Sequence, residues 1–211
     1  MKTSSMQNGK SMNAIKGIKS MNVNKTLILA LTLLSASAFA QTTEIAVNRD
    51  VSQQTRIEKG LESGELNTKE AAKLEHAEGR VDHMEAAALK DGSVSAQEAA
   101  RIKQQQNNVS KEIYQQKHDA QTGNPDSASS TRMQKDVQRN INQQKRIATG
   151  VNNGNLNAQE TAKLEQGQAA ESRREAKAGA DGHVGANEQA KIQAKEDRES
   201  KRIQRKKHND K

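Results

Sequence analysis

The chain has 211 residues, a formal net charge of +8, no cysteine, and only two aromatic side chains of the Phe, Tyr and Trp type. The lack of cysteine excludes disulfide bonds and thiol-based catalysis. Alanine, glutamine, lysine, glutamate and arginine are abundant. These residues form helices well and supply little large apolar surface, so the composition predicts an all-α protein with a thin hydrophobic core.

An apolar run of nine residues, 26–34, follows Lys25 and precedes small residues that end in Ala38-Phe39-Ala40. The run is too short for a membrane-spanning helix, which needs about 20 apolar residues. Its flanks are typical of a cleavable secretory signal. We therefore expect a signal peptide at 21–40, cleavage after Ala40, and a periplasmic or secreted protein. Residues 1–20 are then an upstream extension, which is either a longer basic n-region or the product of a start codon placed too far upstream.

Charge is distributed unevenly once this leader is set aside. The leader carries five lysines and no acidic residue, so the formal charge of residues 41–211 is +3. Residues 41–120 have a net charge of −3, whereas residues 121–211 have a net charge of +6. The C-terminal half is therefore the basic half of the chain.

The sequence matches itself when it is shifted by ninety residues. The segment AKLE at 72–75 recurs at 162–165, and the QQ pair at 53–54 recurs at 143–144. Self-similarity at a fixed period indicates an internal duplication. We predict two tandem three-helix repeats, at 41–118 and 135–211, joined by a flexible linker at 119–134 that contains the only proline, Pro125.

Each repeat is expected to contain three helices separated by glycine turns. In the first repeat the apolar spacing predicts helices over 47–62, 68–89 and 96–117. Gly79 interrupts the second of these at a cost of about 1 kcal/mol relative to alanine. The second copy replaces three apolar seam residues, so we expect it to be less ordered and helical only in part. The replacements are Val81 by Glu171, Met84 by Arg174, and Leu89 by Gly179.

Four turns share one pattern, in which a glycine is followed by Leu or Val two residues later and by Glu six residues later. The glycines are Gly64, Gly92, Gly154 and Gly182. In three of the turns an Asn or Ser stands three residues before the Glu, which is the pattern of a helix capping box. The preceding glycine is then expected to supply a left-handed backbone conformation. The fourth turn has Gly185 at the cap position and lacks that side chain.

The same turns resemble the second half of an EF-hand calcium loop, whose glycine, aliphatic residue and bidentate glutamate have this spacing. The resemblance implies calcium ligation by Asp91 with Glu98, and by Asp181 with Glu188. Most of the earlier ligand positions in these loops lack oxygen side chains. Helix capping is therefore the preferred interpretation, and calcium binding is the alternative. No other cofactor is predicted.

Residues that could support catalysis or specific binding are few. No nucleophile–base arrangement, zinc-protease motif or phosphate-binding glycine loop occurs, so we predict neither an enzyme nor a small-molecule substrate. The C-terminal tail is strongly basic and is a candidate site for an anionic surface such as lipopolysaccharide or anionic lipid. The absence of stacking aromatics argues against nucleic acid as the partner. The candidate anion-binding residues are Lys201, Arg202, Arg205, Lys206 and Lys207.

The full pattern combines a signal peptide, QQxRIxxG at 53–60, the glycine turns, and SxxIxxxKH at 110–118. It resembles small exported helical repeat proteins of Gram-negative bacteria that carry degenerate EF-hand-like turns. The resemblance implies a compartment and no activity. Our first hypothesis is a non-catalytic protein that acts through protein contacts or self-association, using its helix seams and the glutamine patches at 53–54 and 104–106. The alternatives are a weak calcium-binding protein and an anionic-surface binder.

Overall fold

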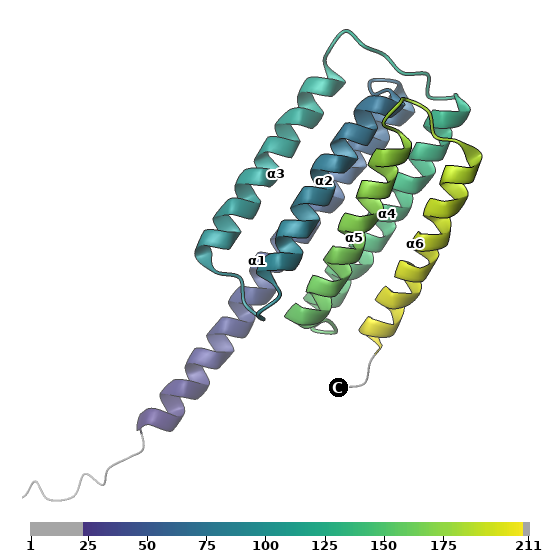
Figure 1. The fold of residues 1–211 in the computed structure, drawn as a ribbon. Helices are drawn as coiled ribbons and strands as arrows, with labels where there is room; N and C mark the ends of the chain where they lie inside the picture. Colours follow the sequence, from purple (N-terminus) through teal and green to yellow (C-terminus); the bar gives the residue numbers. More distant parts are fainter. Residues whose placement is uncertain (1–22, 209–211) are drawn as a thin grey trace, which may run out of the picture. The chain divides into compact units, whose positions relative to one another are not determined.

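The computed structural model describes the backbone of residues 23–208 and the side chains of residues 43–208. These residues contain six helices and no strand, which confirms the predicted all-α class (Figure 1). The helices are α1 (Val23–Ser63), α2 (Thr68–Ala88), α3 (Ala96–Lys117), α4 (Ala128–Asn152), α5 (Ala158–Ala178) and α6 (Ala186–Lys207).

The described residues divide between Ala36 and Ser37 into two units, and every side chain that the structure describes belongs to the second. The predicted extension at 1–20 lies outside the described residues, as do the side chains of the predicted signal peptide. Within the described part of the chain, no helix combines the length and apolar character needed to cross a membrane.

Local patterns in the sequence predicted the bounds of α2 and α3 closely, whereas the helix predicted over 47–62 begins much earlier, at Val23, and ends at Ser63. Helix α3 has the predicted bounds, and α2 ends one residue earlier than predicted. The second half differs from the expectation of partial helicity, because α5 has the same 21-residue length as α2 and α6 has the same 22-residue length as α3. The three helices of the second half are therefore fully formed. Its stability relative to the first half stays a prediction.

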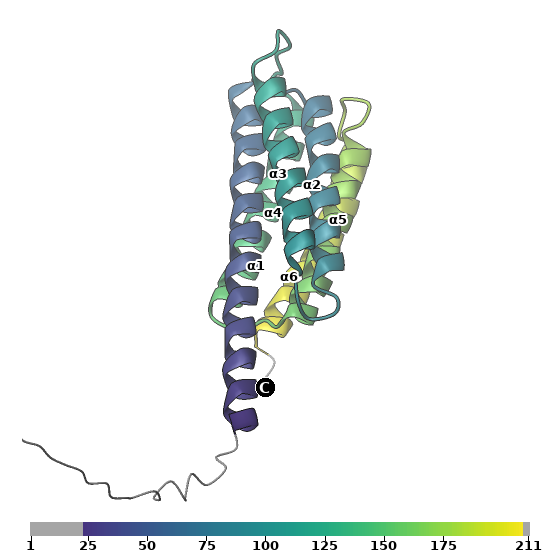
Figure 2. The same ribbon diagram turned by 90° about the vertical axis from the view of Figure 1, so that its left-hand side faces the viewer.

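Helices α2 and α5 lie side by side at the centre of the bundle (Figures 1 and 2). Helices α1 and α4 lie behind them in the view of Figure 1, and α3 and α6 flank the pair. The central helices are antiparallel, and their backbones approach closely at Gly79. A Cβ atom added to Gly79 would lie 3.2 Å from the carbonyl oxygen of Ala169 and 3.2 Å from the Cβ of Ser172. The glycine in the middle of α2 therefore makes room for the facing helix.

The apolar core passes from one half of the chain into the other. The largest cluster of buried hydrophobic residues contains Leu61 and Leu74 from the first half together with Met133 and Ile141 from the second. A second cluster joins Val47 of α1 to residues of α4, α5 and α6. Burial of this shared surface is the main apolar contribution to stability, at about 25 cal/mol per Å². Residues 37–208 thus share their core instead of forming two separate ones.

The connection between α3 and α4 is shorter and more constrained than the flexible linker predicted at 119–134. Helix α4 already begins at Ala128. The amide of Gly123 donates a hydrogen bond to the carbonyl oxygen of Gly64, at 2.8 Å. A Cβ atom at Gly123 would overlap the carbonyl oxygen of Leu66. The linker is therefore held against the turn between α1 and α2.

Packing also compensates for one of the apolar side chains that the second half lacks. Met133 is fully buried and packs against Gly179, where a Cβ atom would come within 2.5 Å of the Met133 Cε. The position equivalent to Met133 in the first half is Thr43. Met133 of α4 therefore supplies apolar volume next to the position where the first half has Leu89.

Replacing Gly79 by leucine tests the close approach of α2 and α5. Helix propensity alone predicts that Gly79→Leu stabilises the protein by up to about 1 kcal/mol. The structure predicts a loss of about 1–3 kcal/mol or more, because the new side chain would overlap α5. Urea denaturation measures the difference. The control Ala87→Leu places the same side chain on an exposed position of α2 and should change stability by at most about 0.5 kcal/mol. A stabilised Gly79→Leu variant would contradict the close packing of α2 against α5.

Candidate functional site

The four glycine turns begin helices with hydrogen-bonded caps, as predicted. At the start of α2 the Asn67 side chain accepts from the Glu70 amide and the Glu70 carboxylate accepts from the Asn67 amide, both at 3.0 Å. Helices α3 and α5 have the same capping box. In α6 only half of it is present, with the Gly185 amide donating to Glu188 at 2.9 Å. The four turn glycines have φ values between +67° and +96°, as the left-handed interpretation requires.

The four candidate calcium ligands are bound to protein groups of their own turns. Asp91 accepts from the Ser93 amide at 3.0 Å, and Asp181 accepts from the His183 amide at 2.8 Å. Glu98 and Glu188 accept from the cap residues of α3 and α6. Across residues 43–208, no three or more His, Asp or Glu side chains are grouped so that they could hold a metal ion. Capping and turn formation therefore account for all four carboxylates.

The predicted basic tail is the end of a packed helix. Lys201, Arg202, Arg205, Lys206 and Lys207 all belong to α6, and Ile203 between them is fully buried. Two of these cations form ion pairs, Arg202 with Glu199 at 3.2 Å and Lys206 with Glu160 at 3.8 Å. Because a helix presents residues three and four apart on one face, their spacing places several of the cations along the same side.

A groove of about 650 Å³ runs between α5 and α6 and is lined by six cationic side chains. Its floor holds two buried acids, Glu171 and Glu199, and the Glu199 carboxyl group packs onto the backbone at Gly167. The basic tail seen in the sequence includes only the C-terminal three of the six cations. The spacing of residues 195, 198, 202 and 205 could have revealed Lys195 and Arg198, whereas Arg174 lies on a different helix. The six are Arg174, Lys195, Arg198, Lys201, Arg202 and Arg205.

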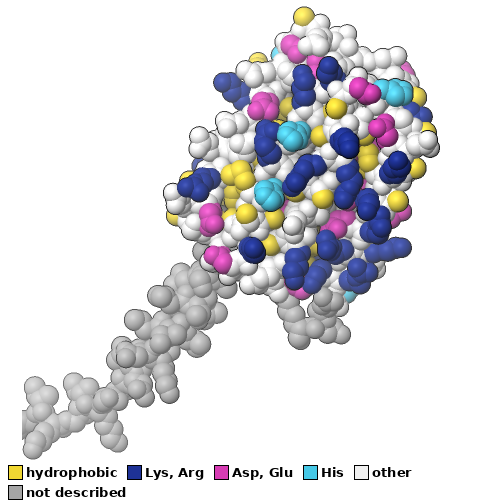
Figure 3. All heavy atoms as spheres, in the orientation of Figure 1, with side chains coloured by type: hydrophobic (Ala, Val, Ile, Leu, Met, Phe, Trp, Pro, Cys, Tyr) yellow, Lys and Arg dark blue, Asp and Glu magenta, His cyan; other side chains and the backbone are white. Residues whose placement is uncertain are grey.

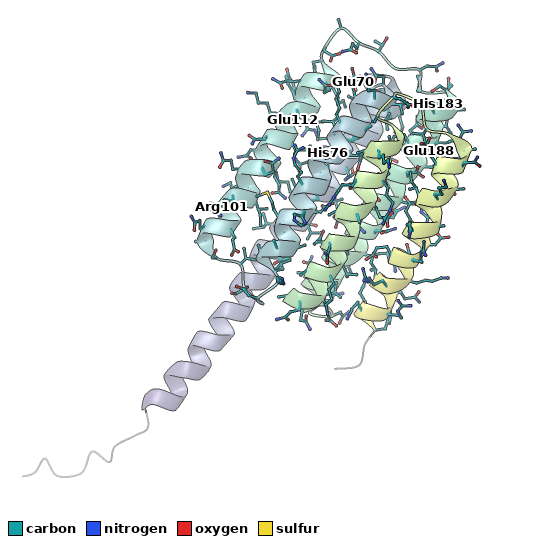
Figure 4. All side chains as sticks on the ribbon, in the orientation of Figure 1. Glu70, His76, Arg101, Glu112, His183 and Glu188 are labelled. Atoms are coloured by element: carbon teal, nitrogen blue, oxygen red, sulfur yellow. The ribbon has the colours of Figure 1, made fainter. Side chains whose placement is uncertain are left out.

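This groove continues into two further hollows on the same side of the molecule. One of about 410 Å³ contains Arg174 and Lys195 of the groove together with Lys177 and Lys191. The other, of about 680 Å³, shares Lys177 and extends to α2 and to Glu112 of α3. Figure 3 shows Lys and Arg side chains spread over this side, and Figure 4 shows His76 of α2 among them. We call the cationic side chains of these three hollows on α2, α5 and α6 the basic face. On α2 they are Lys69, Lys73 and Arg80; on α5 they are Arg173, Arg174 and Lys177; on α6 they are Lys191, Lys195, Arg198, Lys201, Arg202 and Arg205.

Acidic side chains have the opposite distribution, because twelve of them are buried. Among the described residues no Lys or Arg is buried to the same degree. Four of those on α2, at positions 75, 78, 82 and 85, are spaced by three, four and three residues, a helical stripe that was not predicted from the sequence. The buried acids are Asp50, Glu70, Glu75, Glu78, Asp82, Glu85, Asp136, Glu165, Glu171, Glu175, Glu196 and Glu199.

Buried amide side chains donate hydrogen bonds to many of these carboxyl groups. The Gln106 amide nitrogen lies 2.8 Å from Asp50 Oδ1 and 3.1 Å from Glu85 Oε1. In the second half, the Asn140 amide nitrogen lies 3.0 and 2.8 Å from the two oxygens of Glu175. Asn140 and Glu175 stand ninety residues after Asp50 and Glu85, and Glu196 stands ninety residues after Gln106. Each half therefore has two carboxyl groups and one amide at these three positions, in a different order.

Burial changes the protonation of these acids. Removal from water raises the pKa of Asp50 and of Glu75 to about 7, because the charged form loses its hydration. It raises the pKa of Glu165 and of Glu196 to about 8. Neighbouring acids add to the effect at both, through Asp50 on Glu165 and Asp136 on Glu196. The interior therefore favours neutral carboxylic acids near neutral pH.

Comparisons with protein-family models, with curated proteins and with solved structures found no match for this chain.

Removing a cap hydroxyl should weaken α3 by a predictable amount. Ser95 accepts from the Glu98 amide at 3.2 Å. Ser95→Ala is therefore expected to lower the free energy of unfolding by about 1 kcal/mol. Chemical denaturation measures this, with Ser93→Ala as the control, since Ser93 lies in the same turn and does not cap the helix. Equal effects of the two substitutions would show that the cap does not stabilise α3.

Calcium should leave the thermal stability of the protein unchanged. The ion requires six to eight oxygen ligands, whereas the turn carboxylates already accept hydrogen bonds from their own backbone amides. Thermal unfolding followed by circular dichroism, in calcium chloride and in a chelator, should give the same midpoint. A calcium-dependent rise in the midpoint that Glu98→Gln removes would instead establish a calcium site.

Proposed function

We propose that this protein is a non-catalytic, exported helical protein that binds an anionic membrane surface through its basic face. The face offers cations from three neighbouring helices and spans a groove and two adjoining hollows. Cations near an anionic membrane each contribute about 1 kcal/mol to binding. Several of them on one side of a rigid bundle therefore support adsorption without a covalent anchor.

The strongest support comes from comparing equivalent positions in the two halves of the chain. Lys195, Arg198 and Arg205 of the groove correspond to three uncharged residues of α3, which are Gln105, Asn108 and Gln115. Helices α3 and α6 have the same length of 22 residues, and in both the N3 glutamate accepts from the amide of the cap residue. Helix formation at these positions therefore does not require a cation. The added charges are better explained by a partner that is negative.

Most of the groove cations form no ion pair with the buried acids beneath them. Glu171 and Glu199 at the floor of the groove are raised in pKa by burial, which reduces their negative charge. They face Arg174 and Arg202 at 2.9 and 3.2 Å. Lys195, Arg198, Lys201 and Arg205 form no ion pair with any described residue. Lys195 and Arg198 act on the buried Glu171 without pairing with it, so their charges remain available to an external partner.

Self-association, the first hypothesis from the sequence, receives less support from the side chains on which it rests. Gln53, Gln54 and Gln106 are buried and hydrogen-bonded inside the chain. The seam residues Leu74 and Val81 pack into the chain's own core. Most of the apolar and amide side chains that suggested helix pairing between molecules are thus used within one molecule, whereas Gln104 stays exposed and Gln105 is half-buried.

We further propose that the chain arose by internal duplication of a three-helix unit, with a less stable second copy. Equivalent hydrogen bonds support this history. Arg56 donates to the Ser110 carbonyl at 3.1 Å, and Arg146, ninety residues later, donates to the Ser200 carbonyl at 2.9 Å. Duplication supplies a first copy in which the fold is maintained, so the second was able to acquire the basic groove.

The membrane proposal is tested by giving the groove the residues of the first copy. The triple variant Lys195→Gln, Arg198→Asn and Arg205→Gln removes three positive charges. At about 1 kcal/mol per charge, its affinity for vesicles should fall on the order of a hundredfold. Co-sedimentation with vesicles of phosphatidylglycerol and phosphatidylcholine measures the affinity, and binding should weaken as salt is added.

A matched control removes the same charge from another helix. Arg101→Gln, Lys103→Gln and Lys111→Gln neutralise three exposed cations of α3, outside the basic face. These changes should reduce vesicle binding far less. Equal losses in both triple variants would indicate a response to net charge alone, and unchanged binding of the groove variant would refute the proposed function.

A further inference from the structure

Glu78 is a buried acid whose carboxyl oxygens accept no hydrogen bond. It lies in the middle of α2, is fully buried, and neither of its carboxyl oxygens accepts a hydrogen bond. An ionised carboxylate without donors in an apolar interior is strongly disfavoured. The protonation state of Glu78 therefore has to be explained by what the neighbouring helices offer.

The amide of Gln53 on α1 is a matching unpaired acceptor. Its nitrogen donates to the Gln106 carbonyl at 2.7 Å and to the Ser110 hydroxyl at 2.8 Å, which uses both of its hydrogens. Its oxygen Oε1 is buried and accepts no hydrogen bond. Gln53 Oε1 on α1 therefore lacks a hydrogen-bond donor, and Glu78 on the neighbouring helix α2 lacks a hydrogen-bond partner.

The second half shows the complete arrangement at the equivalent positions. Gln143 stands ninety residues after Gln53, and Gln168 stands ninety residues after Glu78. The Gln168 amide nitrogen donates to Gln143 Oε1 at 2.7 Å. The Gln143 amide donates in turn to the Glu196 carbonyl at 3.2 Å, just as Gln53 donates to the Gln106 carbonyl. A carboxyl group can replace the donor Gln168 only when it carries a proton.

The charges around Glu78 also oppose its ionisation. Burial acts first and raises its pKa well above the ordinary value, and the acids Asp50 of α1 and Glu75 of α2 raise it further. The cations Arg49 and Arg56 of α1 lower it, but their guanidinium groups are held by Asn107 and Ser110 of α3.

The groups of α3 and α5 near Glu78 add no positive charge that would favour its ionisation. The α3 groups near Gln53 are the Gln106 carbonyl and the Ser110 hydroxyl, and neither is charged. Glu165 of α5 acts on Asp82, and Asp82 is in turn linked to Glu78, so that helix adds a further acid to the same network. Every neighbouring acid favours the neutral form of Glu78.

We propose that Glu78 is a proton-binding site, in which a neutral carboxylic acid donates its O–H to Gln53 Oε1 and loses that bond when the proton leaves. The consequence is a fold stabilised by acid. Because the folded protein holds the proton more tightly than the unfolded chain does, the stabilisation is fully present below the unfolded value near 4.5. It declines as the pH rises from there through the folded value.

Glu78→Gln tests the proposal because it installs the donor that the second half uses. Urea unfolding of the purified protein from pH 5 to pH 8 measures how the unfolding constant depends on pH. Between the unfolded and the folded pKa of Glu78, only the folded state holds the proton. In this pH range the unfolding equilibrium constant of the wild type should rise with pH more steeply than that of the variant, by about a factor of ten per pH unit. At pH 8 the variant should therefore be the more stable protein.

A reciprocal variant and a matched control complete the test. Gln168→Glu should create a second proton site, so its unfolding constant should rise about tenfold per pH unit more than that of the wild type. Glu62→Gln changes an exposed acid of α1 and should leave the pH dependence unchanged. The proposal is overturned if Glu78→Gln and Gln168→Glu both show the pH dependence of the wild type.

Discussion

The packing of this protein is constrained by the acidic side chains that lie between its helices. Twelve acidic side chains are buried, and no described Lys or Arg is buried with them. Glu171, Glu196 and Glu199 form ion pairs with partly exposed arginines, whereas most of the others, if ionised, would lack both hydration and counter-ions, at a cost of several kcal/mol each. Neutral acids, in contrast, can donate as well as accept hydrogen bonds, and the interior offers unpaired amide oxygens at Gln53, Gln54 and Gln144. Protonation therefore allows α1, α2, α4 and α5 to pack around polar side chains.

The same constraint shapes the surface. Since the acids lie inside and the cations lie outside, the exterior is more basic than the formal charge of +3 for residues 41–211 indicates. The imbalance is greatest on α6, where Glu196 and Glu199 are buried and the cations of the groove remain exposed. Deprotonation of the buried carboxyl groups at high pH would both add negative charge to the protein and weaken its fold. Affinity for an anionic surface and stability are thus expected to change in the same direction with pH.

Local structure could be predicted from the sequence because its causes are local. The caps of α2, α3 and α5 depend on residues three apart, and their pattern gave the starts of those helices correctly. Features that depend on distant residues were missed. Three such contacts are those of Gly79 with Ala169, of Met133 with Gly179, and of Gly123 with Gly64. They could not be predicted without knowing that α2 and α5 pair antiparallel and which path the linker takes. The basic groove was only partly recognised, since the predicted tail left out Lys195 and Arg198 earlier on α6, and Arg174 comes from α5.

The protonation state of the buried acids is open to direct observation by infrared spectroscopy of the folded protein in D₂O at pH 7. Protonated carboxyl groups absorb separately from carboxylates, so their C=O band reports neutral acids without unfolding the protein. If the buried acids are neutral, the spectrum at pH 7 has a carboxylic-acid band that decreases in the Glu78→Gln variant and disappears from the wild type at alkaline pH. A spectrum at pH 7 with carboxylate absorption alone would contradict a core of neutral acids.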